Sequence, residues 1–315
     1  MKNIKIIEVP SEIGAGTRGA SLGIDSIKIA ALDFMSNFFT NFLTHKVEDE
    51  NKALYNPVET PYAKRIKSIL TVNERTSEAI KDAIKNGFIP VVMSGDHSNA
   101  IGTIAGIKMA KPKSKLGVIW IDAHADLHTP YTTPSGNVHG MPLAASIAED
   151  NKENQAHEID KSTESYWNQL KNLGKICPKV DPDDIVFISI RDLEREEKKL
   201  IDKYKIKMIS TAELRKKGVE NVIRNVMRYL SDCSDIYVSF DVDSLDSSIS
   251  KGTGTPVSNG LREREAEDLV SKLMQNRKVT CFELTEVNPT LDKENLMSEI
   301  AFNIIQRSVN VLMMS

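Results

Sequence analysis

Seven short apolar runs, separated by helix-like segments, constrain the fold of this chain more than any other feature. Most of the runs are continuously apolar and do not alternate with polar residues, which is typical of parallel strands covered on both faces. Their alternation with helices predicts an α/β fold: a single doubly wound, mostly parallel sheet with helices on both faces. The predicted strands are 4–9, 88–94, 116–122, 184–190, 206–210, 235–243 and 279–287.

Helical patterning occupies most of the sequence between these strands. Two stretches, 45–60 and 149–165, are instead polar, charged and weakly patterned, and we expect them to be surface loops. His157, in the second stretch, is predicted to be solvent-exposed. Because no internal repeat or linker divides the sequence, we predict one domain over residues 1–315. The predicted helices are 23–38, 61–86, 98–110, 139–149, 193–204, 211–231, 261–276 and 292–308.

The composition narrows the class of protein. The chain has 315 residues, 40% of them hydrophobic, which suits a globular protein with a large core. Its formal charge of −3 argues against a nucleic-acid binder and against a membrane-surface role. No apolar run approaches the roughly 20 residues that span a bilayer. The three cysteines, Cys177, Cys233 and Cys281, are far apart, so we expect small packed residues, reduced thiols and a cytoplasmic location.

Polar residues gather where four of the predicted strands end. A single Asp or Ser after a strand is often only a helix N-cap, but four coincident clusters are not explained in that way. In open α/β sheets, ligands bind outside the carboxyl ends of the strands, so these clusters predict a site there. The clusters are Asp96-His97-Ser98, Asp122-x-His124-x-Asp126, Asp241-x-Asp243 with Asp246, and Glu283 with Glu286.

Two of these clusters have a period of two, which places their side chains on one side of an extended chain. If the strands are neighbours, four carboxylates and two imidazoles converge. Such carboxylates cannot all stay ionised unaided, and two divalent cations would offset their charge. Mixed His and Asp ligands without thiolates favour Mn, with Fe, Co, Ni or Zn as alternatives. A charged surface rim would not explain why these residues follow the most apolar strands. The expected ligands are His97, Asp122, His124, Asp126, Asp241 and Asp243.

Five motifs resemble those of the ureohydrolases in order and spacing: "SGDHS", "DAHAD", "SGNVHG", "SFDVDSLD" and "EVNP". The chain is more similar to arginases than to agmatinases, because "TPYTTPSGNVHGMP" resembles the arginase substrate loop. The resemblance covers most of the chain except the two polar stretches. It implies a three-layer αβα fold, two Mn²⁺ ions per subunit and a homo-oligomer, either a trimer or a hexamer.

The resemblance also implies roles for matching residues. His97, Asp122, Asp126 and Asp241 would hold one ion, and His124, Asp122, Asp241 and Asp243 the other, with Asp122 and Asp241 bridging. Further implied residues are Asp126 as acceptor from a metal-bridging hydroxide, His139 as proton shuttle, Glu286 as partner of the guanidinium, Thr255 beside it, and Ser135 and Asn137 as contacts of the substrate carboxylate.

The implied residues meet the chemical requirements of guanidinium hydrolysis. A guanidinium carbon is a poor electrophile, and it needs hydroxide at neutral pH, which two metal ions provide. The departing amine needs a proton, a task that suits histidine near pH 7. A carboxylate such as Glu286 can align the planar cation by paired hydrogen bonds.

Two positions depart from the arginase pattern. Arginases usually have Asn where this chain has His128, and Asp where it has Glu194, whereas Glu197 matches the final acid of that motif. Both changes concern recognition of the far end of the substrate. We therefore predict hydrolysis of L-arginine to L-ornithine and urea, and keep open agmatine, a guanidino acid or an arginine homologue as the substrate.

An alternative from another functional class is a catalytically inactive, arginase-like regulator. Such a protein would be expected to lack one or more metal-ligand residues, and every ligand position is filled here. A deacetylase-type relative would need one metal ion and a different His-rich motif.

Overall fold

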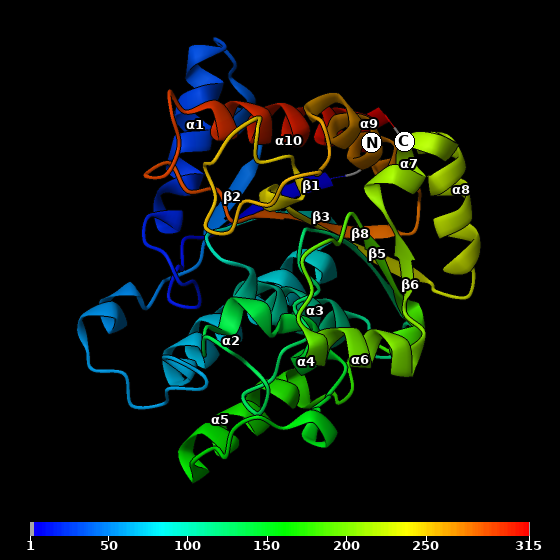
Figure 1. Cartoon of the computed structure of the whole chain (residues 1–315). Coiled ribbons are helices and arrows are strands. Elements are labelled where there is room, and N and C mark those ends of the chain that lie inside the picture. Colours follow the sequence, from blue (N-terminus) through cyan, green and yellow to red (C-terminus); the bar gives the residue numbers. More distant parts are fainter. Residues whose placement is uncertain (1–2, 315) are drawn as a thin grey trace.

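The computed structural model describes residues 3–314, and these are built around one eight-stranded parallel sheet (Figure 1). The strand order is β2-β1-β3-β8-β7-β4-β5-β6, so the predicted doubly wound sheet is confirmed. The strands are β1 Asn3–Val9, β2 Leu43–Lys46, β3 Phe88–Ser94, β4 Leu116–Ile121, β5 Ile185–Ile188, β6 Lys207–Ile209, β7 Asp235–Asp241 and β8 Val279–Thr285.

Helices pack on both faces of the sheet, as the continuous apolar strands predict (Figure 1). One face is covered by α1 (Gly23–Asp33), α7 (Thr211–Lys217), α8 (Val219–Tyr229), α9 (Glu263–Met274) and α10 (Leu296–Met314). The other is covered by α2 (Ile66–Lys85), α3 (Ala100–Ala110), α4 (Pro142–Ser146), α5 (Lys161–Lys171) and α6 (Arg195–Tyr204).

Strand β4 shows why its sequence does not alternate. Ile119 and Ile121 point into one hydrophobic cluster, while Val118 and Trp120 point into the other, and all four are fully buried. Successive side chains therefore face opposite cores, and both faces require apolar residues.

The strand order contains a switch point that positions the site. The chain builds β1, β2 and β3 at one side of the sheet, then crosses to β4 and fills the gap with β7 and β8. Crevices at such a reversal, at the carboxyl ends of the strands, are where open α/β sheets bind ligands.

The two polar stretches differ from the prediction. Residues 45–60 begin inside β2, an edge strand whose residues are all exposed and which pairs with β1 through its backbone. Such a strand needs no apolar pattern, so the sequence did not reveal it. Residues 149–165 run into α5, whose first residue is Lys161.

His157 is also not simply solvent-exposed. Its ring stacks on Tyr62 with centroids 4.1 Å apart, and its Nε2 lies 2.7 Å from the carbonyl oxygen of Thr133. The second polar stretch therefore packs on the protein through this histidine, a contact between distant segments that local patterning cannot show.

Other differences are local. The predicted helix 211–231 is divided into α7 and α8 at Gly218, whose φ of 77° interrupts the helix. Cys233 and Cys281 are buried as predicted, whereas Cys177 is exposed. Among the described residues, no helix has the length and apolar character needed to span a membrane.

Candidate metal centre

The strand order brings the four polar clusters together. Strands β3, β8, β7 and β4 are consecutive in the sheet and parallel, so their carboxyl ends meet at one edge. His97 follows β3, Glu286 follows β8, Asp241 ends β7 and Asp122 follows β4. The convergence expected from the sequence is therefore present.

His97 is the centre of a first group of candidate ligands. Its Nδ1 lies 3.0 Å from Oδ2 of Asp122, 3.1 Å from Oδ2 of Asp126 and 3.2 Å from Oδ2 of Asp241. Despite these distances, Nδ1 of His97 and Oδ2 of Asp122 are buried without a hydrogen bond of acceptable geometry. A cation among these atoms would satisfy them, so the donor set fits a metal ion.

Two further contacts fix the orientation of the His97 ring. Its Nε2 lies 2.7 Å from Oγ of Ser239, and its face stacks on Trp120 with centroids 4.0 Å apart. A hydrogen bond on the remote nitrogen fixes the orientation of a ligating imidazole. Ser239 was not predicted, although it lies two residues before Asp241 on the same strand.

His124 is the centre of a second group. Its Nδ1 lies 3.0 Å from Oδ2 of Asp243 and 3.6 Å from Oδ1 of Asp122, so Asp122 belongs to both groups. Asp243 is held by the backbone N–H of Ala123, which donates to its Oδ1, and by the hydroxyl of Thr255, which donates to its Oδ2. A shared carboxylate is the arrangement that a pair of ions requires.

The electrostatics of these groups show a crowded anionic site. Burial, and then the charges of Asp243 and Asp122, raise the pKa of Asp241 well above its ordinary value. Burial and the charge of Asp122 raise the pKa of Asp126 to about 6. His97 opposes this crowding, because its three carboxylate partners outweigh burial and raise the imidazole pKa. Divalent cations would take over this compensating role.

Two site residues adopt left-handed backbone conformations. Asp126 has φ of 52° and Glu286 has φ of 67°. Residues other than glycine rarely adopt such angles, and they persist where the surroundings fix them, often at functional sites. At Asp126, the contact with His97 is made from this conformation.

His139 and Glu286 form a buried pair beside the first group. Nδ1 of His139 lies 3.1 Å from Oε1 of Glu286, which also accepts from the backbone N–H of His97. Burial lowers the pKa of His139, but the bond to Glu286 and its charge raise that pKa to about 9. Glu286 therefore binds Nδ1 and leaves Nε2 as the nitrogen able to serve a substrate.

A third His–carboxylate group contains both unusual residues. Nε2 of His128 lies 3.1 Å from Oε2 of Glu194 and 3.8 Å from Oε2 of Glu197. The side chain of Glu197 is 2% exposed, and its burial raises the pKa of this carboxyl to about 8. Glu194 is half-exposed, and mainly its hydrogen bond to His128 lowers its pKa to about 2.

The predicted substrate loop is fixed by the second polar stretch and by the segment that follows the first. The backbone N–H of Lys64 donates to the carbonyl of Gly136, and Nζ of Lys64 donates to Oδ1 of Asn137 over 3.3 Å. His157 contacts Thr133 at the start of the loop. The loop is thereby tied to residues far away in the sequence.

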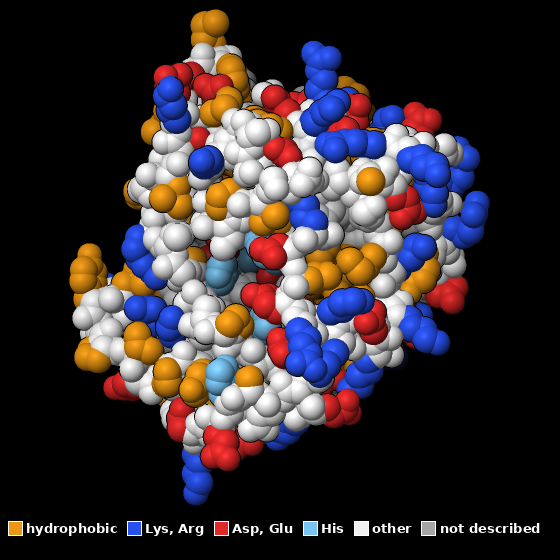
Figure 2. All heavy atoms as spheres, in the orientation of Figure 1, with side chains coloured by type: hydrophobic (Ala, Val, Ile, Leu, Met, Phe, Trp, Pro, Cys, Tyr) orange, Lys and Arg blue, Asp and Glu red, His pale blue; other side chains and the backbone are white. Residues whose placement is uncertain are grey.

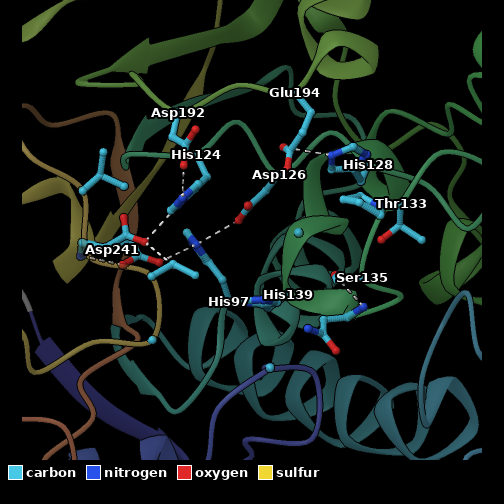
Figure 3. A pocket seen from close by; sticks show the side chains of 18 of the residues that line it. His97, His124, Asp126, His128, Thr133, Ser135, His139, Asp192, Glu194 and Asp241 are labelled. Carbon is cyan, nitrogen blue, oxygen red and sulfur yellow. Dashed lines mark hydrogen bonds and ion pairs between the residues drawn. The ribbon is translucent and has the colours of Figure 1, made fainter.

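All three groups line one pocket, a hollow in which histidine and acidic side chains gather (Figure 2). Its volume of about 440 Å³ falls in the roughly 300–1,000 Å³ range of small-molecule sites. In Figure 3, His97, His124 and Asp241 lie to one side, and His128 with Glu194 to the other. The predicted residues on its wall are His97, His124, Asp126, His128, Ser135, Asn137, His139, Glu194, Glu197, Asp241, Asp243 and Thr255.

Two predicted residues, Asp122 and Glu286, do not line the pocket and lie behind its wall. The structure also adds lining residues that were not predicted, of which Gly16, Thr17 and Asp192 come from three separate segments. Asp192 lies 3.6 Å from Nε2 of His124. Its position after β5 is the sequence signal that could have revealed it, because acids also follow the other strands of the site.

Comparison with known proteins agrees with this geometry. A protein-family model described as the arginase family matches residues 2–309. An arginase of Bacillus subtilis (strain 168) is 35% identical over 312 residues, which cover 97% of each chain. A crystal structure of Bacillus subtilis arginase aligns with a TM-score of 0.83 and 32% identity over 98% of each chain. Entamoeba histolytica arginase in complex with L-ornithine aligns with a TM-score of 0.82 and 25% identity, over 98% of this chain and 99% of that one.

Proposed function

The chain belongs to the arginase family, and on that premise we propose that it hydrolyses L-arginine to L-ornithine and urea. The observation that carries the proposal is the pair of buried His–carboxylate groups that share Asp122 beneath the pocket. The L-ornithine bound by the Entamoeba histolytica arginase supports an amino-acid substrate.

We assign two Mn²⁺ ions to these groups, with Co, Ni or Fe as alternatives. His97, Asp122, Asp126 and Asp241 would hold the first ion, and His124, Asp122, Asp241 and Asp243 the second. When bound, the ions supply a hydroxide nucleophile at neutral pH. Asp126 lines the pocket, so it would accept a hydrogen bond from this nucleophile.

His139 would deliver the proton that the departing amine needs. Its Nδ1 is bound to Glu286, and the same carboxylate raises the imidazole pKa, which favours the protonated ring. Its side chain lines the pocket, where the leaving group would be. Glu286 lies behind the pocket wall, so its pairing with the guanidinium through Oε2 would require the substrate to displace part of that wall, while Oε1 keeps its bond to His139.

The far side of the pocket would bind the amino-acid end of the substrate. Ser135 and Asn137 would contact the carboxylate, and Glu194 and Glu197 the ammonium group. His128 lies against Glu194, so it would compete with that ammonium for the same carboxylate. This contact favours the second candidate, hydrolysis of a related guanidino compound such as agmatine, a guanidino acid or an arginine homologue.

The test is a substrate panel on the Mn-loaded protein. Urea and the amine product are measured for L-arginine, agmatine, a guanidino acid and L-homoarginine. Arginine is expected to give ornithine and urea in equal amounts with the highest kcat/KM. A higher kcat/KM for another compound selects the second candidate, and urea from none of them refutes both.

We also propose that the protein is a homo-oligomer, either a trimer or a hexamer, located in the cytoplasm. Exposed hydrophobic side chains on α1, Ile29 and Leu32 at 54% and 71% exposure, support self-association. The three cysteines make no disulfide. Light scattering coupled to size-exclusion chromatography tests the assembly, and a monomer would contradict it.

A further inference from the structure

The group formed by His128, Glu194 and Glu197 has the composition of a metal site, although it lies apart from the two groups that share Asp122. One candidate ligand atom from each residue lies within 4.8 Å of the others. All three residues line the pocket, so the group has an open side. An imidazole with two carboxylates is a donor set that suits Zn²⁺ and similar borderline ions.

The distances fit an ion among these atoms. Zn²⁺ takes nitrogen and oxygen ligands at about 2.0–2.2 Å, which places tetrahedral ligand atoms about 3.4 Å apart. The two separations from Nε2 of His128, 3.1 Å to Glu194 and 3.8 Å to Glu197, lie on either side of this value. A small outward movement of Glu194 would bring its separation to this value, and Glu194 is free to move because its side chain is 52% exposed.

The two buried members are already oriented. Nδ1 of His128 lies 3.2 Å from Oγ1 of Thr132, which turns Nε2 toward the carboxylates. Glu197 accepts from the backbone N–H of Leu127 on one oxygen and from that of Glu194 on the other. Hydrogen bonds of this kind hold ligands in place for a metal ion.

The charges also favour a cation. Two carboxyl groups face one imidazole, so when both are ionised the group is anionic even with His128 protonated. A divalent ion would offset both carboxylates and use Nε2 as a neutral ligand.

We propose that His128, Glu194 and Glu197 form a third divalent-cation site, selective for the borderline class that includes Zn²⁺, whose occupation closes the pocket to substrate. The inhibitory part rests on the proposed function, because these residues would contact the amino-acid end of the substrate. The binding part does not depend on turnover. An ion here would remove both acids from ammonium recognition and would narrow the pocket.

Ion counting tests the binding part. The Mn-loaded protein is freed of excess metal and equilibrated briefly with Zn²⁺, and both metals are counted per chain by mass spectrometry. The wild type is expected to bind about one more Zn²⁺ equivalent than His128→Asn. Glu194→Gln, at a half-exposed position that does not threaten folding, is expected to raise the Kd of this additional Zn²⁺ by about tenfold or more.

Two variants serve as matched controls. His45→Asn removes an exposed histidine on β2, and Glu196→Gln removes a carboxylate beside the site that does not line the pocket. Both should bind Zn²⁺ as the wild type does. Equal Zn²⁺ uptake by the wild type, His128→Asn and Glu194→Gln would overturn the proposal, as would uptake that only replaces Mn.

Kinetics test the inhibitory part. Zn²⁺ at about ten times its Kd should raise the apparent KM for arginine about tenfold without lowering kcat, and His128→Asn should abolish this rise. A fall in kcat that is equal in both proteins would overturn inhibition through this site. If no guanidino compound is hydrolysed, the proposed function fails, while the ion count still decides the third site.

Discussion

Two His–carboxylate regions lie on the same pocket, yet they differ in how the fold builds them. The candidate ligands of the metal centre stand at the ends of three central strands, β3, β4 and β7, and most of them are buried. The group of His128, Glu194 and Glu197 stands on a loop and on the first turn of α6, and Glu194 is half-exposed. Similar residue types therefore occur in a rigid setting and in an adaptable one.

This difference indicates where the substrate specificity can change while the hydrolytic reaction is retained. A change among the strand-end ligands would leave buried charges uncompensated, which is costly. A change at the edge of the pocket alters only the side chains that would contact the end of the substrate remote from the guanidinium. The two departures from the arginase pattern, His128 and Glu194, both lie in the adaptable region.

The largest expected effect comes from breaking the metal centre. Asp241→Asn should lower kcat/KM by about a thousandfold or more, because it removes a carboxylate that we propose both ions share. It should also abolish the rise in Tm that Mn²⁺ causes by binding the folded state. The exposed Asp232→Asn is the control. Retention of both metal ions and activity would show that Asp241 is not a ligand.

The next effect concerns proton delivery. His139→Asn should lower kcat by about a hundredfold or more while the metal content stays unchanged. The loss should be similar for every guanidino substrate, since the proton goes to the common leaving group. A change confined to KM would instead make His139 a binding residue.

A smaller effect is expected on the titration of His139. Glu286→Gln removes the carboxylate that raises this pKa, so the pKa should fall from about 9 by about one unit or more. The wild-type pair stabilises the fold fully below the unfolded histidine pKa of about 6.5, provided that Glu286 is ionised, and loses this contribution as pH rises through about 9. NMR titration of the metal-free protein measures the shift, and an unchanged pKa would refute the coupling.

The smallest effect is expected from restoring the arginase pattern. His128→Asn with Glu194→Asp should change kcat/KM for arginine relative to agmatine by about tenfold or less. The content of tightly bound Mn should not change, in contrast to Asp241→Asn. An unchanged ratio would mean that these two residues carry no specificity.

The sequence predicted the central part of the molecule well because local patterns determine it. Continuous apolar runs ending in acids and histidines revealed β4 and β7, and the period of two grouped Asp122 with His124. Strand β2 was not predicted because an exposed edge strand pairs through its backbone alone. The packing of His157 and the bond of Ser239 to His97 were not predicted because each depends on contacts across the fold.

The most direct test is to measure the release of urea from L-arginine and agmatine by Mn-loaded wild type, Asp241→Asn and His128→Asn. We predict urea from the wild type, loss of both reactions in Asp241→Asn, and an altered ratio of the two rates in His128→Asn. No urea from the wild type, or a His128→Asn variant that changes the turnover of both substrates by the same factor, would contradict the division between a metal centre for chemistry and a pocket edge for specificity.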